Sequence, residues 1–158
     1  MVDDYTRSHE NEAEKLDRNW NELLQELRVS QTGVQVLTGF LLTLPLQPTF
    51  AELSTLERNI YVVAISLSIL ATGLLVAPVS MHRVLFRKRR KETLVEVGNW
   101  VARVGLVTLA LASASVAAFV FSILFGEITG LWVGGATLLV FALVWLVLPM
   151  VMQAPDRD

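Results

Sequence analysis

Cysteine is absent from this sequence of 158 residues, and histidine occurs only twice, as His9 and His82. The lack of cysteine excludes disulfide bridges and metal sites built from thiolates. The sequence also has no HExxH motif, no phosphate-binding glycine loop and no credible spacing of a nucleophile and a base. We therefore expect no enzymatic activity, and no bound cofactor or metal.

Charged residues are absent from the cores of four long apolar runs that fill most of the chain. About 20 apolar residues in a helix span the hydrocarbon core of a bilayer, which is about 30 Å thick. The sequence therefore predicts an all-α fold, a four-helix transmembrane bundle over residues 29–152. Gln31 and Gln35 make the first run the least apolar, so a half-buried interfacial helix is its alternative. The predicted spans are residues 29–46, 60–79, 104–125 and 131–152.

Lysine and arginine are distributed unevenly between the connections of this predicted bundle. Segment 1–28 holds eight acids and four bases, whereas connection 80–103 holds seven bases and two acids. With four spans, twelve of the thirteen Lys and Arg residues lie on one side of the membrane, and only Arg58 lies on the other. Because basic residues are retained in the cytoplasm, we predict that both termini are cytoplasmic.

The acidic segment 1–28 predicts an amphipathic cytoplasmic N-terminal helix. Its apolar residues recur at spacings of three and four, which is the helical period. Such a helix can continue into the first span, lie on the membrane surface or bind a partner helix. The apolar residues are Leu16, Trp20, Leu23, Leu24 and Leu27.

The cytoplasmic loop 80–103 contains one run of five consecutive basic residues. Such a run beside a span is typical of a topology signal. Each base near an anionic leaflet contributes about 1 kcal/mol, so anionic lipid headgroups are the predicted partners of this run. The run lacks interleaved aromatic residues, so we do not expect nucleic-acid binding. The five residues are Arg87, Lys88, Arg89, Arg90 and Lys91.

Small residues recur at a spacing of four along spans three and four. In lipid, small side chains allow helices to approach closely. We predict a tight antiparallel hairpin of these two spans, and contact with another copy of the chain is the alternative. The packing residues are Ala110, Ala114, Ala118, Ser122 and Gly126, followed by Gly130 and Gly134.

The connection after span one contains two local structural signals. The segment LPLQP should bend or end span one, because proline lacks an amide donor and clashes with the preceding turn. Ser54 and Glu57 then have the spacing of a capping box just before span two.

A polar cluster is predicted at the cytoplasmic mouth of the bundle. Gln31 and Gln35 are costly in the membrane unless their amides find partners. The cluster could serve a small anion, a lipid headgroup or the acidic segment of a partner. Alternatively, it could consist of interhelical hydrogen bonds and headgroup contacts that fix the register of the helices. Its residues are Arg28, Gln31, Gln35, His82 and Arg83.

Two segments resemble a family of small, uncharacterised bacterial membrane proteins, mostly actinobacterial. They are ELRVSQTGVQVLTGFLLTLP at 26–45 and APVSMHRVLFR at 77–87. The resemblance implies a location in the bacterial plasma membrane. Some members are labelled sodium:proton antiporters. Cation antiporters usually need a carboxylate within the membrane, and the predicted spans contain none.

Three functions fit these observations. The first is an accessory or scaffold subunit that binds a larger membrane protein through helix packing and its cytoplasmic face. The second is a homo-oligomeric channel or transporter for a small ion, and the third is an anionic-lipid-binding protein.

Overall fold

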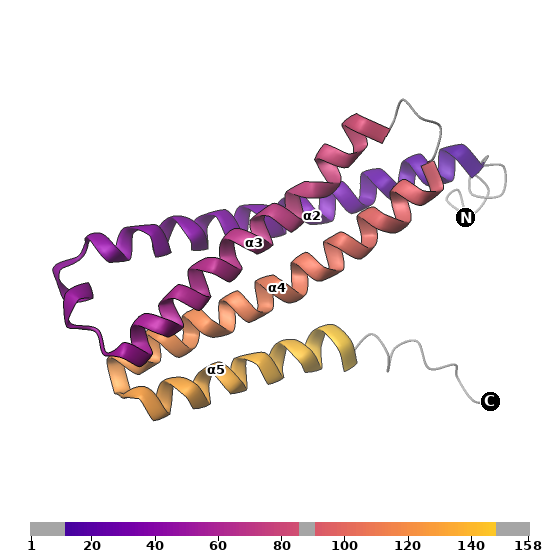
Figure 1. Ribbon diagram of the computed structural model, residues 1–158. Coiled ribbons are helices and arrows are strands. Elements are labelled where there is room, and N and C mark those ends of the chain that lie inside the picture. The colour runs from indigo at the N-terminus through magenta and orange to yellow at the C-terminus, as the bar shows by residue number, and fades with distance from the viewer. Residues whose placement is uncertain (1–11, 86–90, 148–158) are drawn as a thin grey trace, which may run out of the picture.

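The computed structural model describes residues 12–85 and 91–147. Within these ranges every long element is a helix, and four helices are long and apolar enough to cross a membrane. The predicted all-α fold with four candidate spans is therefore confirmed (Figure 1). The elements are α2 (Glu12–Thr43), η1 (Leu44–Leu46), η2 (Pro48–Glu52), α3 (Thr55–Leu85), α4 (Lys91–Phe125), α5 (Glu127–Ala142) and the π-helical turn η4 (Leu143–Val147).

Helix α2 is a single unbroken helix of 32 residues. It includes the described part of the acidic N-terminal segment and continues through residue 28 into the first candidate span, Arg18–Leu46. Of the three arrangements considered for the amphipathic segment, the structure therefore shows the helix that is continuous with the span. The span ends where expected, because two short 3-10 turns follow α2, one with Pro45 as its second residue and one that begins at Pro48.

The central pair of the fold is α3 and α4, which pack along each other (Figure 1). Helix α2 packs on both of them, and α5 packs along α4. Two small cores hold α2 on this pair. One core joins Leu27 and Val34 to Ala71, Leu75 and Ala102. The second core lies toward the other end of α2 and contains Leu41, Tyr61, Ala64 and Phe119.

The start of α3 is closed by the expected capping box. The Ser54 amide donates to Glu57 Oε2 at 2.8 Å, and the Glu57 amide donates to Ser54 Oγ at 3.2 Å. Ser54 Oγ also donates to Glu127 Oε1 at 2.7 Å. The Ser54 hydroxyl thus accepts a hydrogen bond from a free amide at the start of α3 and donates one to the first residue of α5.

Helices α4 and α5 form an antiparallel hairpin with one residue between them. Gly126 supplies the turn with φ 92° and ψ 159°, a region of backbone conformation that is essentially restricted to glycine. A Cβ atom added at Gly126 would meet nothing within 4 Å, so Gly126 does not belong to the helix contact in which the spacing of four placed it. The spacing of four extends past Phe125, the last residue of α4, and so includes Gly126, which lies in the turn.

Ala114, Ala118 and Ser122 of α4 lie at the contact with Gly130 and Gly134 of α5. A Cβ atom at Gly130 would collide with Ser122 Oγ and the Ala118 carbonyl oxygen, and one at Gly134 would lie 2.8 Å from the Ala118 Cβ. Ala110, Ala114, Ala118 and Ser122 are all buried on α4. The backbones of α4 and α5 therefore touch closely, which lets dispersion stabilise the pair in lipid.

Candidate functional site

The structure separates the two glutamines that the sequence placed in one polar cluster. Gln31 turns into the bundle, and its Nε2 donates to the Leu75 carbonyl oxygen of α3 at 2.7 Å. Gln35 is exposed, as is Arg28. His82 and Arg83 belong to the last turns of α3, but their side chains lie outside the described residues. The proposed five-residue cluster is thus traced only in part: Gln31, Arg28 and Gln35 share one side of α2, but only Gln31 contacts α3, and the other two are exposed.

The Gln31 hydrogen bond lies one helical turn before Pro78, the buried proline inside α3. Pro78 has no amide hydrogen, so the Leu74 carbonyl oxygen lacks its usual helical donor and the turn that contains Leu75 is disturbed. In a membrane a neighbouring helix can supply hydrogen bonds to such a turn. Gln31 supplies a donor to this turn, so the contact fixes α2 against α3 and does not leave the Gln31 amide free for a ligand.

One face of α2 carries an exposed stripe of polar and small residues, which we call the polar stripe. Its members follow one another at intervals of three or four, so they lie along one side of the helix. The stripe runs from the N-terminal part of α2 to its last turn, through the whole of the predicted first span. Its residues are Asn21, Gln25, Arg28, Thr32, Gln35, Gly39 and Thr43, and all of them are exposed.

The opposite face of α2 is the one that packs on the bundle. Trp20, Leu27, Val34 and Leu41 recur at a spacing of seven and are at most 4% exposed. This regular apolar seam faces α3 and α4, so the polar stripe points away from the rest of the molecule.

Two members of the polar stripe hydrogen-bond to their own helix. Thr32 Oγ1 donates to the Arg28 carbonyl oxygen at 3.0 Å, and Thr43 Oγ1 donates to the Phe40 carbonyl oxygen at 2.7 Å. Within the part of the chain that the structure describes, neither the Gln35 amide nor the Arg28 guanidinium has a side-chain hydrogen bond or an ion pair. These two side chains therefore have donors available for a partner.

The N-terminal part of α2 is covered by α4 on its apolar side. Trp20 is 4% exposed, and its ring lies directly over Gly98 of α4, with Leu23 beside it. This apolar face is therefore already occupied within the chain. The basic residues Arg87 to Arg90 lie outside the described residues, and Lys91 begins α4 with a side chain that is not described.

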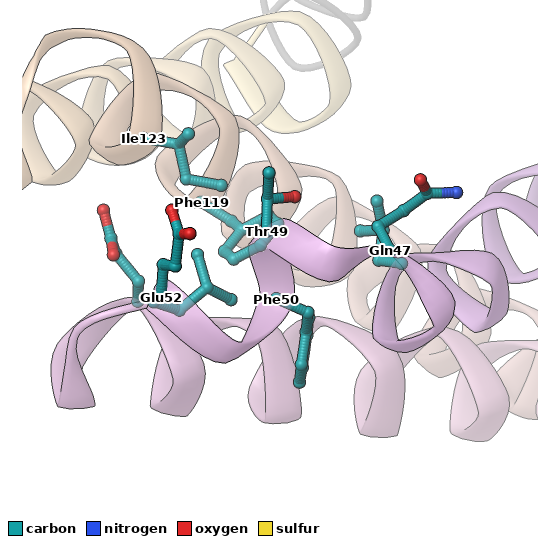
Figure 2. A pocket seen from close by; sticks show the side chains of 9 residues that line it. Gln47, Thr49, Phe50, Glu52, Phe119 and Ile123 are labelled. Carbon is teal, nitrogen blue, oxygen red and sulfur yellow. The ribbon is translucent and has the colours of Figure 1, made fainter.

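A cavity of about 350 Å³ opens at the opposite end of the bundle. In Figure 2, Thr49 and Glu52 come from η2 and lie across from Phe119 and Ile123 of α4. The carboxylate of Glu57 also lines the cavity, but it is already bound to the Ser54 amide. Among the residues that the structure describes, no three acidic or histidine side chains are grouped to hold a metal ion.

Sequence reasoning identified Arg28 and Gln35 but missed the length of the stripe to which they belong. Asn21, Gln25, Thr32, Gly39 and Thr43 complete it. The signal was present, since polar and small residues recur at intervals of three or four through an otherwise apolar run. The contact between Gln31 and the turn before Pro78 was also missed, because the sequence does not show which residues of α2 and α3 lie next to each other.

The fold and this face define a small all-helical membrane protein with four candidate spans. The chain belongs to DUF6328, a family of unknown function, whose model matches residues 9–149. The match includes both segments on which the resemblance to an uncharacterised family was based. No curated protein and no solved structure matches the chain.

Proposed function

We propose that this protein is a non-enzymatic membrane protein that acts as an accessory or scaffold subunit. It presents the polar stripe of α2 to transmembrane helices outside its own bundle. The observation that carries this proposal is the exposure of Arg28, Thr32 and Gln35 on a face directed away from α3, α4 and α5.

The energetic argument concerns the Gln35 amide. An amide in contact with hydrocarbon has no hydrogen-bonding partner, and polar side chains between transmembrane helices are satisfied by a neighbouring helix. The exposed glycines Gly33 and Gly39 have open space around them, so a neighbouring helix can approach α2 closely. A neighbouring helix that hydrogen-bonds to Gln35 therefore removes the free-energy cost of an unpaired amide in lipid.

The contact surface differs from the one suggested by the amphipathic N-terminal segment. The apolar side of that segment is buried, because Trp20 and Leu27 pack against the chain's own helices. The exposed side of the same segment carries Glu22, Gln25 and Glu26. A cytoplasmic partner would therefore meet a polar surface.

The proposed location is the bacterial plasma membrane, with both termini in the cytoplasm. This orientation is supported by the uneven distribution of basic residues, of which only Arg58, in the first turn of α3, lies at the far end. The beginning of α2 and the end of α5 lie at the same end of the bundle (Figure 1). Anionic lipid headgroups beside Arg87 to Lys91 are part of the same proposal.

Photo-crosslinking in native membranes tests the stripe directly. A photoreactive amino acid at position 35 should yield an adduct with a protein. The same group at Leu70, an exposed position on α3, should react with lipid. If position 35 also yields lipid adducts only, the stripe is not an interface and the proposal fails.

A second candidate function is a homo-oligomeric pathway for a small ion. It is favoured by the same stripe, because polar residues with amide or charged groups lie along α2, while the cores of the other described spans carry only serine and threonine among apolar residues. A cation antiporter is disfavoured, since Glu26 precedes the predicted first span, residues 29–46, and Glu127 begins α5, so neither carboxylate lies at the centre of a predicted span.

Flux into proteoliposomes distinguishes the pathway from the scaffold. Replacement of exposed Gln35 by leucine should reduce any ion flux, whereas Gln31→Leu changes an internal contact and should leave the flux of folded protein in place. Absence of flux for every small ion tested at several pH values would remove this candidate.

A further inference from the structure

We infer that the polar stripe is covered by α2 of a second copy of the chain, and that copies join head to tail in a closed ring with parallel α2 helices innermost. This inference rests on the proposed function, because it names the partner of the same stripe.

The first observation is an unpaired charge on each flank of α2, with Arg28 inside the polar stripe and Glu26 outside it. Glu26 and Arg28 are both exposed, and within the described residues neither forms an ion pair. Residues two apart on an α-helix are separated by about 200° around the axis. These opposite charges therefore cannot meet on their own helix, and they lie on opposite flanks of α2.

A parallel ring brings these two flanks together. Rotation about the membrane normal keeps each residue at the same depth in every copy, so the Arg28 flank of one α2 faces the Glu26 flank of the next. The two positions differ by about 3 Å along the axis. A helical side chain leans toward the N-terminus, so the long Arg28 side chain extends toward the level of Glu26.

The charges also distinguish this arrangement from a two-fold dimer. In a parallel two-fold contact centred on the stripe, the same patch meets itself, so Arg28 would face Arg28. Like charges in contact are unfavourable. A head-to-tail contact instead joins unlike flanks and closes into a ring.

The remaining helices leave room for this contact. The apolar seam of α2 holds α3 and α4 on the side away from the stripe, so the rest of each bundle lies outside the ring. On the Glu26 flank, Gly33 has nothing within 4 Å of its Cβ position. Thr32 and Gly39 then lie nearest the ring axis. Gln35 lies on the Arg28 flank, seven residues further along, so it meets the next copy and its amide is removed from lipid.

Cysteine cross-linking in native membranes tests the ring, because the chain has no cysteine of its own. Phe40 and Leu42 are 70% and 58% exposed and lie on opposite flanks, like Glu26 and Arg28. The double variant Phe40→Cys/Leu42→Cys, treated with a short thiol cross-linker, should give a ladder of multimers. Each single variant should give monomer, because like flanks do not meet.

Charge exchange tests the pairing itself. In the cross-linking background, Arg28→Glu and Glu26→Arg should each weaken the ladder by more than about tenfold, and the double exchange should restore it. Arg103→Glu makes the same change of charge at an exposed position on α4 and should leave the ladder intact.

The outcomes separate this inference from the proposed function. A dimer from either single cysteine variant would show a two-fold contact and overturn the ring. A different protein cross-linked at position 35, with no ladder, would overturn self-association and leave the scaffold function standing. No ladder and only lipid at position 35 would overturn both.

Discussion

At the scale of the residue, identical side chains in the first span have different roles. Gln31 donates to the Leu75 carbonyl oxygen of α3, whereas Gln35 lies on the same side of α2, further from the seam, and is exposed. Helical periodicity correctly placed both amides on one arc of the helix. It could not show that α3 lies against one edge of that arc, because this depends on tertiary packing.

Replacement of Gln31 by leucine should destabilise the folded monomer by about 0.6–1.7 kcal/mol, the range of hydrogen bonds between membrane helices. The loss arises because the interhelical hydrogen bond from Gln31 Nε2 to the Leu75 carbonyl oxygen is removed. Denaturant-induced unfolding in detergent micelles measures the change. Gln35→Leu is the matched control and should leave monomer stability unchanged; an equal loss in both variants would contradict the assignment.

Ser54→Ala should cost about 1 kcal/mol of stability, which is the usual value of a helix cap. The change removes the acceptor for the Glu57 amide and the donor to Glu127. Thermal unfolding in detergent checks this expectation, and Ser54→Thr should retain most of the stability. A fully stable alanine variant would show that the cap is dispensable.

At the scale of the element, the tightest contact is the hairpin of α4 and α5. The spacing of four predicted which residues lie between the helices. It failed at Gly126, because a regular repeat carries no information about where a helix stops. The capping box and the two prolines did indicate where α3 begins and where the first span ends, since each acts through a specific backbone group.

Gly130→Ala should destabilise the hairpin by about 1–3 kcal/mol, the typical cost of overpacking. The new methyl group meets the Ala118 carbonyl oxygen and lies 2.7 Å from the Ser122 amide nitrogen, and backbone atoms cannot move aside cheaply. Unfolding curves of the purified variants measure the loss. Gly135→Ala adds the same methyl group where nothing lies within 4 Å, so it should be neutral or slightly stabilising.

At the scale of the whole molecule, the number and approximate position of the candidate spans followed from hydropathy and length. Hydropathy alone could not show which helices are neighbours. The central position of α3 and α4 depends on close contacts such as Gly105 against Leu75, and the apolar exterior looks similar on every side of such a helix.

Reporter fusions test the proposed orientation of the entire chain. A cytoplasmically active reporter should work at Met1 and at Asp158, while a periplasmically active one should work only near Gly126 or in the connection around Pro48. Reporters active on opposite sides at the two termini would contradict the four-span topology.

The contact between Trp20 and Gly98 has a mechanical consequence. Helices of 32 and 35 residues are about 48 and 52 Å long, well beyond the roughly 30 Å of hydrocarbon. If the membrane covers the predicted spans 29–46 and 104–125, the surplus lengths of both helices lie at the same end, where Trp20 packs on Gly98. Because α2 is one continuous helix from Glu12 to Thr43, a protein that binds its N-terminal part and rotates it about the helix axis would also rotate Gln35.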